Sequence, residues 1–194
     1  MPDLSSLLLY MTVTMFTPGP NNLTMMYLGA TSGLAGTRRF LTGSALSLLA
    51  KCLLCGLLNV VLASLIPSLV AYLKWLGAAY MLYLAYIMGR SGWQSDAEGV
   101  SRGNTYGSGV ILQLFNMKSW ISCLSLFAVY VIPVTRSFAA ITAVSALYFF
   151  FMLVASLTWG IGGTVLRRFV SAYKKPFGLL MAASLVYCAV TAVR

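Results

Sequence analysis

The chain has 194 residues, of which 60% are hydrophobic and 8% charged, with a mean hydropathy of +0.88 and a formal net charge of +10. A soluble domain carries roughly 25% charged residues, so this composition argues against a water-facing surface. The basic residues fall in short breaks between apolar runs, and we therefore expect no nucleic-acid partner. Histidine is absent and the acidic residues are Asp3, Asp96 and Glu98, so we expect no metal, no cofactor and no enzyme.

Apolar runs long enough to span a bilayer, at about 20 residues each, recur along the chain. The expected fold class is an all-α membrane protein embedded in the lipid bilayer, with residues 1–194 forming a single domain. Six transmembrane helices are predicted over about residues 4–30, 40–65, 68–88, 107–132, 137–166 and 176–193.

The first predicted helix contains a segment that breaks helical hydrogen bonding. It reads Thr17, Pro18, Gly19, Pro20, Asn21 and Asn22. Because proline lacks an N–H, the carbonyls of Thr14 and Phe16 would lose their helical partners, and protein or cavity water must satisfy them within a membrane. Where the helix restarts, free N–H groups attract an anion such as a carboxylate. The alternative is a kink satisfied by neighbouring helices, but two prolines, a glycine and two asparagines together favour a substrate site.

Three further features lie in the first two helices. Lys51 falls deep within the second helix, where it either lines the substrate path or uses its long stem to reach polar groups elsewhere. Nearby Cys52 and Cys55 form a C-x-x-C pattern, which without other ligands at this depth is interpreted as two small hydrophobic residues. Gly29 and Gly33 permit close helix approach, and a homodimer is one use of such a pair.

The fourth predicted helix is interrupted by Asn116, Met117 and Lys118. A lysine at this depth costs at least ~2.5–3.5 kcal/mol on insertion scales, so it should face the bundle interior or water. No acid is available within the predicted helices to pair with Lys118. A substrate carboxylate is the expected counter-ion, and the alternative is a clamp on unwound backbone carbonyls.

Charge and helix number together predict the topology. The loops after the first, third and fifth helices carry Arg38, Arg39, Arg90, Arg102, Arg167, Arg168, Lys174 and Lys175, whereas the other side carries Arg136 and Arg194, with Lys74 a few residues into the third helix. Both termini are therefore expected on the periplasmic or extracellular side. Helices 1 and 4 occupy corresponding positions in halves that cross the membrane in opposite directions. This layout is typical of two inverted three-helix repeats with a site near the midplane, where the broken helices meet.

At these segments the chain resembles the LysE/RhtB superfamily of bacterial amino-acid exporters. The resemblance is carried by residues 17–22, by the Lys74–Tyr80 segment, and by Leu112–Lys118, where most members have Asn-Pro-Lys and this chain has Asn-Met-Lys. The apolar residue at this position, the Asn21-Asn22 doublet and the segment from Leu185 to Val190 are similar to the cysteine and O-acetylserine exporter branch. The resemblance covers the whole chain and implies the bacterial inner membrane and proton exchange.

The predicted function is therefore efflux of a small neutral amino acid or derivative by secondary, alternating-access transport, since no Walker-type loop is present. Lys118 would neutralise the carboxylate, Asn21, Asn22 and Asn116 would orient the substrate, and unwound carbonyls of the first helix would take the ammonium. The predicted substrate-binding residues are Thr17, Pro18, Gly19, Pro20, Asn21, Asn22, Lys51, Asn116 and Lys118. The alternatives are export of another small metabolite and a non-transporting assembly or sensor subunit.

Overall fold

The computed structural model describes residues 4–61, 75, 78–79, 82–83, 85–86, 89, 105–166 and 172–193, and every element delimited within them is helical. The elements are α1 (Leu4–Phe16), α2 (Pro20–Gly36), α3 (Arg38–Val61), α6 (Tyr106–Phe115), α7 (Met117–Ser125), the π-helix η1 (Leu126–Val131), α8 (Phe138–Val165) and α10 (Lys174–Val193). The expected all-helical class is confirmed for this part of the chain. Most of the predicted helix 68–88 and the three acidic residues lie outside the described residues.

The predicted first helix is two helices, because α1 ends at Phe16 and α2 begins at Pro20. Proline is favoured in the first turn of a helix, where its missing N–H has no partner to lose. The first helix was predicted to end near residue 30, and this boundary is wrong, because α2 continues to Gly36. It does so through a kink at Gly33, whose φ of 72° suits a residue without a Cβ.

The predicted fourth helix is also broken, although it contains no proline at the break. The axis bends by 60° between α6 and the helical stretch Met117–Val131. Asn116 stands between them in an extended conformation, with φ −77° and ψ 98°. The remaining long helices, α8 and α10, begin and end within two residues of the predicted ranges 137–166 and 176–193.

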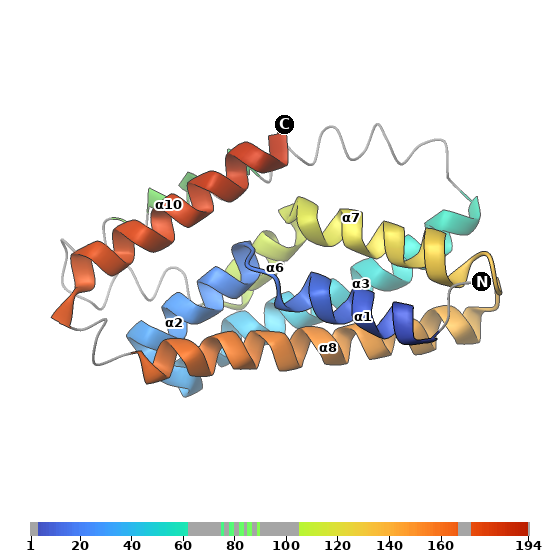
Figure 1. Cartoon of the computed structure of the whole chain (residues 1–194), viewed down its shortest axis with the longest axis horizontal. Helices are drawn as coiled ribbons and strands as arrows, with labels where there is room; N and C mark the ends of the chain where they lie inside the picture. Colours follow the sequence, from blue (N-terminus) through green and yellow to red (C-terminus); the bar gives the residue numbers. More distant parts are fainter. Residues whose placement is uncertain are drawn as a thin grey trace.

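The two halves of the described bundle pack against each other reciprocally. In the first half, α2 packs most extensively against α8, the helix that follows the second break. In the second half, α6 packs most extensively against α3, the helix that follows the first break. Figure 1 shows α8 running along the bundle, with α1 and α2 end to end beside it. Glycines bring these pairs together. A Cβ atom at Gly163 would overlap the backbone oxygen of Met26 in α2, and one at Gly109 would overlap that of Phe40 in α3. Gly29 likewise packs on Gly160 within the same chain.

The buried apolar residues form two cores, and each helix break carries the chain from one core to the other. One core joins α1 and α7 with α8 and with residues 45–55 of α3. The second joins α2 and α6 with α10. Cys52, Cys55 and Cys123 are free thiols buried in the first core. This agrees with the interpretation of Cys52 and Cys55 as small hydrophobic residues.

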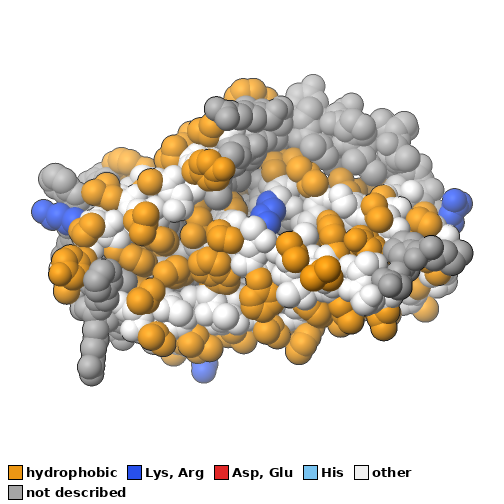
Figure 2. Space-filling model, in the orientation of Figure 1, with side chains coloured by type: hydrophobic (Ala, Val, Ile, Leu, Met, Phe, Trp, Pro, Cys, Tyr) orange, Lys and Arg blue, Asp and Glu red, His pale blue; other side chains and the backbone are white. Residues whose placement is uncertain are grey.

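Two of the described helices, over Arg38–Asn59 and Phe138–Val165, are long and apolar enough to cross a membrane, and α6 with its continuation to Val131 makes a third if the bent pair counts as one span. The surface agrees with this, since hydrophobic side chains are spread over the face drawn in Figure 2. Large apolar residues such as Phe138, Phe150 and Val165 are exposed along α8. The protein is thus a helical membrane protein, and the six-span arrangement stays a prediction.

Candidate functional site

At the first helix break, side chains donate hydrogen bonds to the backbone carbonyls at the end of α1. The amide nitrogen of Asn22 donates to the carbonyl of Met15 at 2.7 Å and to that of Thr17 at 3.1 Å. The indole N–H of Trp159 in α8 donates to the carbonyl of Phe16 at 3.2 Å. The carbonyl of Phe16 was predicted to lose its helical partner because residue 20 is a proline. In the structure a neighbouring helix supplies the donor instead.

Lys118, in the first turn of α7, also reaches this break. Its ammonium nitrogen lies 2.7 Å from the carbonyl oxygen of Thr17 and 3.5 Å from that of Pro18. Its side chain extends over Gly19, where an added Cβ would approach the lysine Cδ to 3.1 Å and the nitrogen to 3.3 Å. The cation of the second broken helix is therefore held at the break of the first. This is the carbonyl contact that the clamp alternative predicted, and it places the same charge at a pocket.

At the second break, side chains of α3 and α7 likewise donate hydrogen bonds to freed backbone carbonyls. The ammonium of Lys51, which is 2% exposed, donates to the backbone carbonyl of Gln113 and to the hydroxyl of Ser119. The indole N–H of Trp120 donates to the carbonyl of Leu114 at 2.6 Å. The Lys51 nitrogen also lies 5.0 Å from the centre of the Trp120 ring. In a continuous helix these two carbonyls would accept from the N–H groups of residues 117 and 118.

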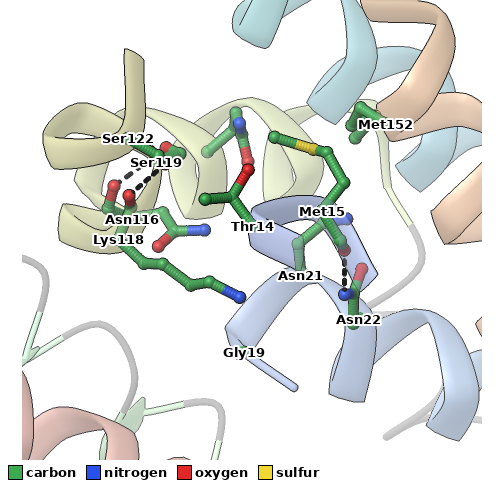
Figure 3. A pocket seen from close by; sticks show the side chains of 11 residues that line it. Thr14, Met15, Gly19, Asn21, Asn22, Asn116, Lys118, Ser119, Ser122 and Met152 are labelled. Atoms are coloured by element: carbon green, nitrogen blue, oxygen red, sulfur yellow. Dashed lines mark hydrogen bonds between the residues drawn. The ribbon is translucent and has the colours of Figure 1, made fainter. Parts of the chain in front are cut away.

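The two breaks meet at a pocket of about 360 Å³, counted together with its opening. In Figure 3 the side chains of α7 face those of α2 across it, and Lys118 extends between them towards Gly19. The lining residues are Thr14, Met15, Gly19, Asn21, Asn22, Gln113, Asn116, Lys118, Ser119, Ser122 and Met152.

The structure brings together most of the nine predicted site residues. Five of them line the pocket, namely Gly19, Asn21, Asn22, Asn116 and Lys118. Thr17 and Pro18 contribute carbonyls to Lys118, and Pro20 begins α2. Lys51 does not line the pocket; it lies behind it, against Gln113 and Ser119, which do. Of the two uses left open for Lys51, the structure shows contact with polar groups.

Sequence reasoning did not find the remaining lining residues, which are Thr14, Met15, Gln113, Ser119, Ser122 and Met152. The hydroxyl residues and Gln113 lie within one or two turns of the predicted breaks, so proximity to a break was the signal that could have found them. Met152 lies in the middle of the apolar helix α8, where nothing in the sequence separates it from core residues.

Two buried amide oxygens at this pocket have no hydrogen-bond partner: Oδ1 of Asn21 and Oδ1 of Asn116. The Asn21 nitrogen is engaged, since it donates to the hydroxyl of Ser156 at 3.0 Å. A buried acceptor left without a donor costs about 1–3 kcal/mol, so both oxygens favour a ligand with N–H groups. The N-termini of α2 and α7, capped by no side chain, also begin at the pocket at Gly19 and Asn116. They favour an anionic group.

Comparison with known proteins assigns a family. The sequence profile of the LysE type translocators matches residues 12–194. The chain is 29% identical over 187 residues to the cysteine/O-acetylserine efflux proteins of Escherichia coli K12 and of Shigella sonnei, and the match covers 96% of this chain and 95% of each relative. No solved structure matches the chain.

Proposed function

Because the chain belongs to the LysE type translocator family, we propose that it exports a small neutral amino acid or derivative, of the cysteine or O-acetylserine kind, across the bacterial inner membrane. The family moves solutes and is not enzymatic, so this protein is an amino-acid efflux transporter and not an enzyme. The observation that carries the site proposal is the position of Lys118, whose ammonium sits where both helix breaks meet.

The substrate carboxylate is bound by the Lys118 ammonium and by the N-terminal ends of α2 and α7. Broken helices in transporters direct such ends at anionic substrate groups. Of the two carbonyl contacts of Lys118, the one to Pro18 is long at 3.5 Å, so a carboxylate replaces it at little cost. Binding thereby alters the contact that holds the two breaks together, which gives the substrate a way to bias the conformation of the carrier.

The substrate ammonium is bound by the amide oxygens of Asn21 and Asn116, which lack other donors. Among the unwound carbonyls predicted for this role, that of Thr17 already accepts from Lys118 and from Asn22. The substrate side chain then faces Met15 and Met152, whose thioethers suit a small, polarisable group.

The carrier is proposed to work by alternating access between two inverted three-helix repeats, with the breaks near the membrane midplane. Support comes from the reciprocal packing, in which α2 lies against α8 and α6 against α3, and from glycine-mediated approach in both pairs. The distribution of basic residues supports periplasmic termini. Exchange against protons is proposed on family resemblance, and the homodimer stays a prediction.

Uptake of labelled L-cysteine and O-acetylserine into inside-out vesicles that contain the protein tests the function. Uptake above that of vesicles without the protein is expected, and it should be inhibited by small neutral amino acids. If other metabolites are carried and these two are not, the substrate class is wrong. Absence of any flux, together with a stoichiometric co-purifying partner, would instead favour an assembly or sensor subunit.

A further inference from the structure

The second helix break contains no proline that would impose it. Residue 117 is a methionine, which retains the backbone N–H that would bond the carbonyl of Gln113 in a continuous helix. A proline would have removed this donor permanently. The N–H cannot reach Gln113 here, because Asn116 is extended and the axis bends by 60°. Side chains that donate to the freed carbonyls must therefore stabilise the bend.

The groups that do so come from Lys51 and Trp120. Lys51 donates to the carbonyl of Gln113, and Trp120 donates to that of Leu114. In a continuous helix these two carbonyls would accept from the backbone N–H groups of residues 117 and 118. Lys51 is the one of the two that lies on a separate helix, α3, and its cation is further held over the Trp120 ring.

The same lysine connects the break to the pocket. Its ammonium also donates to the hydroxyl of Ser119, which in turn donates to the backbone carbonyl of Asn116 at 2.9 Å. Both Ser119 and Asn116 line the pocket, and the amide oxygen of Asn116 is one of the proposed acceptors for the substrate ammonium. Lys51, which does not line the pocket, is therefore linked through Ser119 to the backbone of Asn116.

We propose that Lys51 is a positioning residue that keeps the substrate site assembled. By donating to the Gln113 carbonyl, it stabilises the break of the fourth helix at Asn116. In other helices a proline has this role. This inference rests on the proposed function. It assigns Lys51 no contact with the substrate. Because residue 117 keeps its N–H, the bend on this proposal depends on the contact between α3 and the fourth helix.

If Lys51 acts by stabilising the break, a proline at residue 117 should restore substrate binding to a protein that lacks Lys51. Lys51→Met removes the donor, so the helix is expected to close towards Gln113 and the affinity for L-cysteine to fall by about tenfold or more, as expected for the loss of a buried hydrogen bond to a charged group. Met117→Pro in the same chain removes the competing N–H. Its backbone suits the site, because residue 117 is the first of α7 and residue 116 is already extended.

The matched control is Met117→Ala, which removes the same buried side chain but keeps the N–H. Dissociation constants for L-cysteine, kept reduced, are measured on purified protein by calorimetry for the wild type, for Lys51→Met, and for Lys51→Met combined with either change at residue 117. The proline double variant is expected within about threefold of the wild type, whereas the alanine double variant stays as weak as Lys51→Met.

Two results would overturn the proposal: a Lys51→Met protein that binds as tightly as the wild type, or a proline double variant no better than the alanine one. If Lys51→Met does not fold, the yield of monodisperse protein replaces affinity as the readout, with the same ranking expected. A wild type that binds no amino acid would count against the proposed function, and the ranking of folded yields would still test the role of Lys51.

Discussion

The ammonium of Lys118 lies 2.7 Å from the backbone carbonyl oxygen of Thr17, so a cation on one broken helix is fixed by the unwound backbone of the other. The carbonyl is available because the prolines that follow Thr17 interrupt the helix. The lysine can reach it because the extended Asn116 turns α7 away from the axis of α6. Neither break alone would create this site.

The contact depends on space above Gly19. A Cβ at residue 19 would lie 3.1 Å from the Cδ of Lys118, and the backbone there, with φ −171°, accepts any residue. Gly19→Ala should therefore fold normally but displace the lysine side chain, raising the KM for L-cysteine export about three- to tenfold with little change in melting temperature. In a Lys118→Met background the same change should have no further effect, and an equal effect in both backgrounds would refute the coupling.

Close packing of α2 on α8 gives a stability prediction with an adjacent control. Gly163→Ala places a methyl group onto the backbone oxygen of Met26, whereas Gly162→Ala meets nothing within 4 Å. Overpacking typically costs about 1–3 kcal/mol, so Gly163→Ala should lower the melting temperature of the purified protein by several degrees. Gly162→Ala should leave it unchanged or slightly raised, since alanine favours a helix. Equal melting temperatures would contradict the packing described.

The two amide oxygens of Asn21 and Asn116 can be tested with a substrate analogue. Replacing either residue with leucine removes an acceptor of the substrate ammonium, a hydrogen bond worth about 1.5–3 kcal/mol when one partner is charged. The affinity for L-cysteine should fall by about tenfold or more, while that for 3-mercaptopropionate, which lacks the ammonium, should change little. A parallel loss for both ligands would mean that the asparagines only support the structure.

Met152 gives a prediction about selectivity. Met152→Ala enlarges the pocket on the α8 side, so export of larger amino acids such as L-methionine should rise relative to that of L-cysteine in a competition assay. Met11→Ala is the control, because Met11 is equally buried in the same core but does not line the pocket. It should lower stability by about 2–5 kcal/mol and leave the selectivity ratio unchanged.

The sequence predicts the helical class and the positions of both breaks, because these follow from local chemistry: apolar length, missing N–H groups and polar residues that interrupt apolar runs. It does not predict which way a buried side chain points. Lys51 and Lys118 look alike on that basis, yet Lys51 turns behind the pocket and Lys118 towards it. Met152 could not be identified either, because its part in the site comes from the packing of α8 beside the breaks.

The most direct test concerns the partner of the Lys118 ammonium during binding. The affinity of the purified wild type for L-cysteine is compared with that for L-cysteine methyl ester, which keeps the side chain and the ammonium but has no carboxylate, and the comparison is repeated in Lys118→Met. The account predicts that the wild type prefers L-cysteine by about tenfold or more, and that this preference disappears in a folded Lys118→Met protein. An undiminished preference in that variant would show that another group binds the carboxylate and that Lys118 serves only to clamp the two breaks.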